Sequence, residues 1–176
     1  MKKGTIILLL LVLGGVVIFS KGRMSGTPVT PAMEGYYAPE FSLPLLTGEN
    51  TSLSRARGKV VLVNIWATWC KPCLDEMSSL EALYRKKRDR GLEILAVSID
   101  KGGADVVERF VKKLNLSFPI LLDPTGSVGQ LYGITGVPES FLVSRKGMIV
   151  EKVVGPRDWL HPHSLMTVES LLNEKA

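Results

Sequence analysis

Both cysteines of this 176-residue chain stand two residues apart, in the segment Trp69-Cys70-Lys71-Pro72-Cys73. Because there is no third cysteine, an internal disulfide can only join Cys70 to Cys73. A loop this short provides little of the chain-entropy stabilisation that a long disulfide loop provides. The pair directly follows an apolar run and precedes a helical pattern. A Cys-x-x-Cys in that position is typical of a redox-active dithiol.

The predicted helix gives the two cysteines different positions. Apolar side chains recur at helical spacing from Pro72 onward, so Cys70 stands where the helix begins. Unpaired backbone N–H groups and the helix dipole stabilise a thiolate at such a position, and Lys71 adds a nearby positive charge. Cys73 falls one turn deeper, on the apolar stripe. We therefore expect Cys70 to attack the substrate and Cys73 to resolve the mixed disulfide.

The rest of the chain alternates between strand-like and helix-like apolar patterns. Residues 60–66 and 92–99 are nearly continuous apolar runs, typical of strands buried on both faces. The further predicted elements are a hairpin of 41–43 and 51–53, a strand at 118–122, a hairpin of 140–143 and 148–153, and helices from 72 to Gly91 and at 104–114, 127–132 and 164–172. This order predicts an α/β domain whose mixed sheet is covered by helices on both faces.

The charge is concentrated at the N-terminus. The formal net charge is +5, and four basic residues before Glu34 supply +4 of it. The remainder therefore carries 18 basic and 17 acidic groups, a balance of +1. A surface that follows nucleic-acid phosphates needs clustered Lys and Arg, so the composition argues against nucleic-acid binding.

The first 22 residues are predicted to be a signal-anchor or a signal peptide. Lys2 and Lys3 precede an uncharged run from Gly4 to Ser20, which as a helix would span roughly 25 Å. Good signal-peptidase sites are lacking after the run, which favours an uncleaved anchor in the bacterial inner membrane over a soluble periplasmic form. Residues 23–37 are predicted to be a flexible tether, and residues 38–176 the domain, facing the periplasm or the outside.

The chain resembles thioredoxin in the segment Trp66–Cys73, in Gly136-Val137-Pro138 and in the order of its strands and helices. Within that group it looks like the membrane-anchored, extracytoplasmic thioredoxin-like proteins of bacteria, including those that reduce apocytochrome c. The segment Ala38–Leu43 matches their added N-terminal hairpin. Glu76, three residues after Cys73, is typical of the same subgroup. The resemblance covers roughly residues 38–172 and implies a thioredoxin-like fold with thiol-disulfide oxidoreductase activity.

The resemblance also implies roles for individual residues. Pro138 would follow a cis peptide bond and, with Val137 and Trp69, would contact an extended protein substrate. Trp69 is further expected to shield the dithiol. Thioredoxin has a titrating Asp six residues before its first cysteine, where this chain has Asn64. Glu76 is therefore the leading candidate for the acid or base, and Glu139 is a second.

The same resemblance implies which partners the dithiol has. No cofactor is expected beyond the redox-active disulfide, and no metal. The expected partners are protein thiols and disulfides, together with a membrane electron donor of the thiol-reductant type. No nucleic acid is expected to bind.

Two other functions use the same cysteines. A copper or zinc carrier would need further ligands for a complete site, and the only histidines, His161 and His163, lie far along the chain. A thiol peroxidase would need Pro-x-x-x-Thr-x-x-Cys, but Val63 and Ala67 stand at the Pro and Thr positions. The sequence therefore favours thiol–disulfide exchange and leaves the substrate, the electron donor and the reduction potential open.

Overall fold

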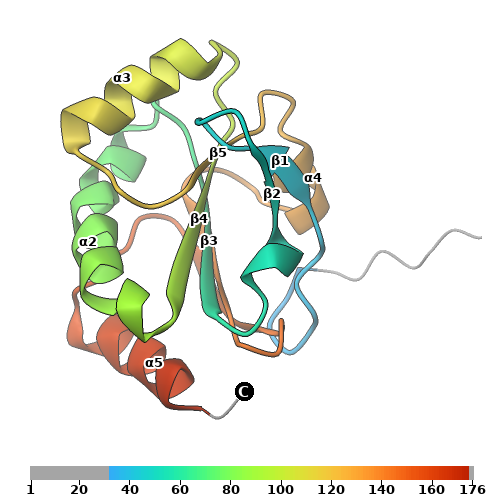
Figure 1. Ribbon diagram of the computed structural model, residues 1–176, viewed down its shortest axis with the longest axis vertical. Coiled ribbons are helices and arrows are strands. Elements are labelled where there is room, and N and C mark those ends of the chain that lie inside the picture. The colour runs from blue at the N-terminus through green and yellow to red at the C-terminus, as the bar shows by residue number, and fades with distance from the viewer. Residues whose placement is uncertain (1–31, 175–176) are drawn as a thin grey trace, which may run out of the picture.

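The structure is a computed structural model that describes residues 32–174 (Figure 1). Its strands are β1 (Ser42–Pro44), β2 (Asn50–Ser52), β3 (Val60–Trp66), β4 (Leu92–Ser98), β5 (Ile120–Leu122), β6 (Glu139–Val143) and β7 (Ile149–Val154). Its helices are η1 (Leu53–Ala56), α2 (Lys71–Lys87), η2 (Arg88–Arg90), α3 (Ala104–Leu114), α4 (Ser127–Tyr132) and α5 (Pro162–Asn173). Each predicted strand and helix is present, and the bounds of β3, α3 and α4 are the predicted ones.

A five-stranded mixed sheet in the order β5-β4-β3-β6-β7 forms the centre of the domain. Strand β3 pairs in parallel with β4 and antiparallel with β6, and all seven of its residues are buried. The register places Asn64 of β3 opposite Ser140 of β6. Both faces of the central strand are covered, as the continuous apolar run predicts. The carboxyl end of β3 leads directly into the cysteine segment.

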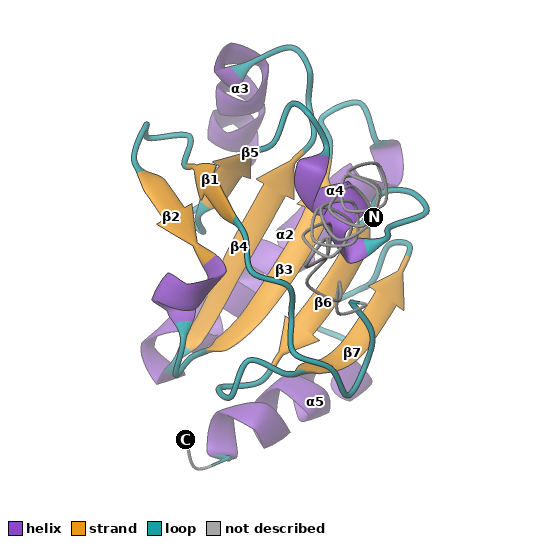
Figure 2. Ribbon diagram, turned by 90° about the vertical axis from the view of Figure 1, so that its right-hand side faces the viewer, coloured by secondary structure: helices purple, strands orange, loops and turns teal. Residues whose placement is uncertain are grey.

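Helices cover both faces of the sheet, as predicted (Figures 1 and 2). Side chains of α2, α3 and α5 pack in one apolar cluster with Leu62 and Trp66 of β3. Side chains of α4 pack on the other face with Val63 and Ile65. Phe41 and Leu53, at the two ends of the added β1–β2 hairpin, join this second cluster. The chain is confirmed as thioredoxin-like, with a mixed central sheet and an N-terminal hairpin.

The boundary between tether and domain lies earlier than the predicted residue 38. The N–H of Gly35 donates to the carbonyl of Ile149 over 2.9 Å, and the N–H of Ile149 donates to the carbonyl of Tyr36 over 2.8 Å. Residues 35–38 thus pair with the edge formed by β7 and the turn before it, and Ala32 is buried. Because a bare strand edge exposes unpaired backbone groups, this pairing makes the last part of the predicted tether a component of the domain.

The predicted signal-anchor lies outside the described residues. Within residues 32–174, no helix combines the length and the apolar character needed to cross a bilayer.

Candidate active site

Cys70 and Cys73 form a disulfide at the N-terminus of α2. Cys70 is the N-cap residue in extended backbone conformation, and the N–H of Cys73 approaches its Sγ at 3.2 Å. Pro72 occupies the first turn, where its missing N–H removes no helical hydrogen bond. Cys70 is 5% exposed, whereas Cys73 is fully buried. Both cysteines are therefore buried, and the small exposure that remains belongs to Cys70.

The loop around Pro138 faces the disulfide. The Val137–Pro138 peptide bond is cis, as expected, and the carbonyl oxygen of Val137 lies 3.4 Å from the Sγ of Cys70. Only a reduced thiol could donate a hydrogen bond across this gap, since a disulfide sulfur carries no proton. Trp69 is 68% exposed, and its role as a shield of the dithiol stays a prediction. Its exposed indole is available for contact with a partner.

A buried polar cluster lies on the face of the sheet that α2 covers. The Nδ2 of Asn64 donates to the Oε1 of Glu76 over 2.7 Å and to the Oγ of Ser140 over 2.9 Å. The Oε2 of Glu76 accepts from the N–H of Arg157 over 3.1 Å. Asn64 and Glu76 are 0% and 2% exposed. The carboxylate thus lies one helical turn after Cys73, in an almost fully buried position.

Burial has the largest effect on the pKa of Glu76. Desolvation raises the pKa of this carboxyl from its ordinary value of 4.5 to about 7, because a buried site disfavours the charged form. Hydrogen bonds from the N–H of Arg157 and the side chain of Asn64 oppose the rise of the pKa. Trp159 opposes the rise least, and its indole N–H makes no hydrogen bond of good geometry. Glu76 is therefore a group that can exchange a proton near neutral pH.

Glu139 occupies a different position from Glu76. Ser140 points toward Asn64, so the preceding side chain in the strand points to the opposite face of the sheet. There the carboxylate of Glu139, fully buried, accepts from the N–H and hydroxyl of Thr135 and pairs with the Nζ of Lys152 at 3.2 Å. The structure does not bring this carboxylate to the side of the sheet that holds Cys73, and its role as an acid or base stays a prediction.

Two contacts to Glu76 were not predicted from the sequence. Arg157 and Trp159 are in the loop between β7 and α5, about eighty residues after the helix they contact. The Arg157 contact uses a backbone N–H, which leaves no residue-type signal. Trp159 is fully buried, and a Trp in a loop could have indicated a packed rather than a free segment.

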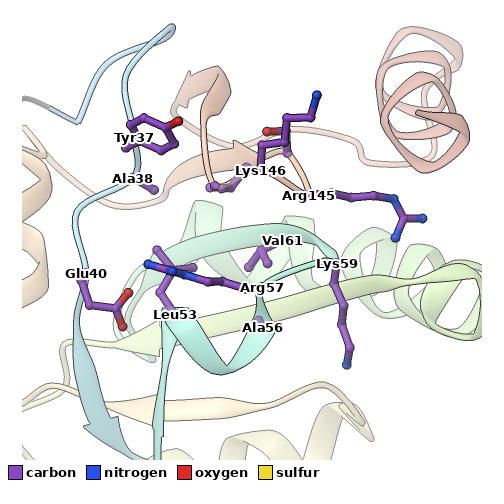
Figure 3. A pocket seen from close by; sticks show the side chains of 13 residues that line it. Tyr37, Ala38, Glu40, Leu53, Ala56, Arg57, Lys59, Val61, Arg145 and Lys146 are labelled. Atoms are coloured by element: carbon purple, nitrogen blue, oxygen red, sulfur yellow. The ribbon is translucent and has the colours of Figure 1, made fainter. Parts of the chain in front are cut away.

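A competing site on the rest of the described surface would be a metal site or a hollow near the disulfide. Between residues 32 and 174, no three His, Cys, Asp or Glu side chains gather so that they could hold a metal ion. His161 and His163 lie at the start of α5, where His161 is the N-cap residue. Figure 3 shows a hollow of about 240 Å³ lined by Tyr37, Arg57 and Lys146, among others. It opens at the end of the sheet where β3 begins, away from the disulfide.

A second hollow adjoins the polar cluster. It has a volume of about 500 Å³ and lies between the first turns of α2 and the loop after β7, with Glu76, Arg157 and Leu160 in its wall. A group bound in it could therefore approach the carboxylate of Glu76.

Comparison with known proteins gives concordant matches. A sequence profile of the AhpC/TSA family matches residues 35–152. The thiol-disulfide oxidoreductase ResA of Bacillus thuringiensis subsp. konkukian (strain 97-27) is 35% identical over 159 residues, which are 88% of this chain and 91% of the relative. The thioredoxin-like protein YneN of Bacillus subtilis (strain 168) is 40% identical over 124 residues, 69% of this chain and 72% of that protein. The thioredoxin domain of a thiol-disulfide oxidoreductase from Bacteroides vulgatus superposes with a TM-score of 0.70 at 29% identity, covering 80% of this chain and 99% of that domain.

Proposed function

The chain belongs to the AhpC/TSA family and is a thioredoxin-like thiol-disulfide oxidoreductase, and from this premise we propose that it reduces protein disulfides outside the cytoplasm. The observation that carries the proposal is the unequal placement of the two cysteines. One sulfur caps the helix beside the Val137–Pro138 loop, and the other is buried one turn before a carboxyl group whose pKa is about 7.

The proposed reaction proceeds in two exchange steps. The thiolate of Cys70 attacks one sulfur of the substrate disulfide, which forms a mixed disulfide and releases the first substrate thiolate. Glu76 accepts the proton of Cys73, and the new thiolate attacks the Sγ of Cys70. This attack releases the second substrate thiolate and closes the Cys70–Cys73 disulfide. Two electrons pass from the protein to the substrate, and a membrane electron donor of the thiol-reductant type returns them.

The proposed substrate surface rests on the same geometry. Trp69 is exposed, Val137 is half-buried with its carbonyl beside Cys70, and the buried Pro138 follows it, which supports their proposed contact with an extended segment of a protein. The disulfide of apocytochrome c, in its Cys-x-x-Cys-His motif, is a substrate of this kind.

We further propose a single N-terminal anchor at residues 1–22. Retention in membranes after a high-salt wash would support that anchor, and loss of the domain to protease added to spheroplasts would support its position outside the cytoplasm. Protection of the domain in intact spheroplasts would place it in the cytoplasm and contradict the proposed compartment.

A peroxidase is the alternative that the family assignment itself raises, because the AhpC/TSA profile matches this chain. Peroxide reduction in the pattern considered above uses a Pro and a Thr before the reactive cysteine. Here those positions are Val63 and Ala67, both fully buried in the apolar core. Neither offers a hydroxyl group to a bound peroxide, so the geometry supports disulfide exchange over peroxide reduction.

Reduced protein should therefore distinguish its substrates sharply. We expect it to reduce the disulfide form of a Cys-x-x-Cys-His peptide at least about a hundredfold faster than it reduces hydrogen peroxide, since Ala67 stands where the peroxidase pattern has its Thr hydroxyl. Stopped-flow measurement of Trp fluorescence during oxidation would give both rates. Faster turnover of peroxide would establish a peroxidase. Tight binding of copper(I) or zinc without any exchange would establish a metal carrier.

A further inference from the structure

The dithiol is bordered by two loops that contain no regular secondary structure. Residues 67–70 connect β3 to α2 and carry Cys70, while residues 133–138 connect α4 to β6 and carry Val137. The two meet at the 3.4 Å approach of the Val137 carbonyl to Cys70. Neither loop has a strand or helix of its own to fix its backbone, so other contacts must set this distance.

The first loop is held by Asp100, which follows β4. One carboxylate oxygen accepts from the backbone N–H of Thr68 over 2.9 Å, and the other accepts from the hydroxyl of Thr68 over 2.6 Å. The hydroxyl of Ser98 adds a third hydrogen bond at 2.7 Å. Asp100 is 6% exposed, and within the described part of the chain no Lys or Arg lies within 4.0 Å of it. Two of the three hydrogen bonds to this carboxylate therefore come from Thr68, two residues before Cys70.

The second loop is held in the same way by Glu139. Its Oε1 accepts from the backbone N–H of Thr135 over 2.8 Å and from the hydroxyl of Thr135 over 3.0 Å. Thr135 itself is exposed, whereas the carboxylate is fully buried and neutralised by Lys152. Thr135 stands two residues before Val137, as Thr68 stands two residues before Cys70.

We propose that Asp100 and Glu139 are positioning residues. Through their hydrogen bonds to Thr68 and Thr135, they fix the two loops that border the dithiol. Hydrogen bonds to an ionised acceptor are shorter and stronger than neutral ones. A carboxylate that receives both the N–H and the hydroxyl of one residue fixes that residue's backbone as well as its side chain. Because exchange needs the reacting sulfurs in line, a small displacement of either loop lowers the rate of exchange.

The two pairs should affect the reaction differently. Thr68 is in the loop that carries the nucleophilic sulfur, so losing its hydroxyl should slow attack on every disulfide. Thr135 is in the loop that lies beside the disulfide but carries no reacting sulfur, and a bound peptide would contact this loop, so losing its hydroxyl should slow attack on peptides and spare small molecules. A purely structural role would lower stability without separating the two kinds of substrate.

The chain offers a matched control on α4. The Oδ1 of Asp123 accepts from both the N–H and the hydroxyl of Ser127, over 3.0 and 2.9 Å. Asp123 is 1% exposed and is therefore buried, as Asp100 and Glu139 are. It caps α4 and follows β5, two strands away from β3. Ser127→Ala therefore removes the same kind of hydrogen bond at a place that touches neither loop.

The test measures exchange by the reduced full-length protein and its variants Thr68→Val, Thr135→Val and Ser127→Ala. One substrate is an oxidised Cys-x-x-Cys-His peptide and the other is dithiobis(nitrobenzoate), a small aromatic disulfide. We expect Thr68→Val to slow both reactions about tenfold and Thr135→Val to slow only the peptide reaction about tenfold. Ser127→Ala should leave both rates within about twofold of the parent protein, and Thr→Ser at 68 or 135 should restore them.

The inference rests on exchange at Cys70, which the parent protein's rates in the same assay establish separately. Equal slowing of both substrates by Thr135→Val would overturn the proposal, as would a loss of rate in Ser127→Ala as large as that in the other variants. Unchanged rates in both valine variants would also overturn it. If a valine variant does not fold, Asp100→Asn and Glu139→Gln, which keep side-chain volume, must show the same separation between substrates.

Discussion

Cys73→Ser is expected to accumulate mixed disulfides with substrates through Cys70, whereas Cys70→Ser should accumulate none, and both variants should lose turnover. The reason is the different position of the two cysteines in the fold. Cys70 caps α2 beside the Val137 carbonyl, while Cys73 is fully buried. Without Cys73, nothing releases a substrate bound to Cys70. Non-reducing gels of both variants, mixed with an oxidised Cys-x-x-Cys-His peptide, would show the difference directly.

The double variant with Ser at both positions is the matched control, since it keeps the surface but has no sulfur. Adducts that survive in this control would come from outside the dithiol. Equal trapping by the two single variants would mean that either sulfur can attack, and would remove the division of labour on which the mechanism depends.

The second large effect is expected from Glu76→Gln. Glutamine keeps the size of the side chain and its capacity for hydrogen bonding but cannot accept a proton. We expect exchange near pH 7 to slow by roughly ten- to a hundredfold, the lower part of the range for a general base. Because Glu76 and Cys73 are one turn apart, their titrations should be coupled, so the apparent values belong to the pair. Thiolate absorbance and exchange rates, measured against pH on the same samples, would test this.

Stability provides a second readout with a definite sign. The pKa of Glu76 rises from 4.5 to about 7 on folding, so between these values the native protein holds a proton that the unfolded chain releases. The free energy of unfolding should therefore fall as pH rises through this window, by about 3 kcal/mol at most. Glu76→Gln should remove that slope.

Asp75→Asn is the control for the Glu76 experiment. Asp75 is the neighbouring acid on α2, and its side chain is 66% exposed. Its substitution removes one negative charge near the dithiol without touching the buried cluster. If this variant slows exchange as much as Glu76→Gln does, the effect is one of general charge. If the thiol titration and the exchange rate are unchanged in Glu76→Gln, Glu76 acts only as an acid that complements the helix dipole.

The parts that the sequence predicted well are those with local signals. The continuous apolar run of β3 and the helical spacing in α3 and α4 gave the observed bounds, because periodicity and turn residues act within a few positions. Gly91 ends the helical segment in left-handed conformation, as expected of a terminal glycine. The Cys70–Cys73 pair and its helix followed from the same local pattern.

The parts that it missed depend on contacts between distant segments. The N–H of Arg157 reaches Glu76 from the loop after β7, and the side chain of Arg157 has no part in that bond. Residues 35–38 pair with the β7 edge through backbone groups, although their composition suggested a tether. Asp100 holds Thr68 between the ends of the neighbouring strands β4 and β3. Contacts between segments so far apart in the sequence leave no periodicity to detect.

The reduction potential of the Cys70–Cys73 pair tests the proposed direction of electron flow most directly. Equilibrating the full-length protein with mixtures of reduced and oxidised glutathione, trapping free thiols and measuring the oxidised fraction gives this value. We expect a potential near or below about −270 mV, because a buried Glu76 disfavours a thiolate and so disfavours the reduced form. A potential near about −120 mV would show a dithiol that oxidises its partners, and would contradict the account.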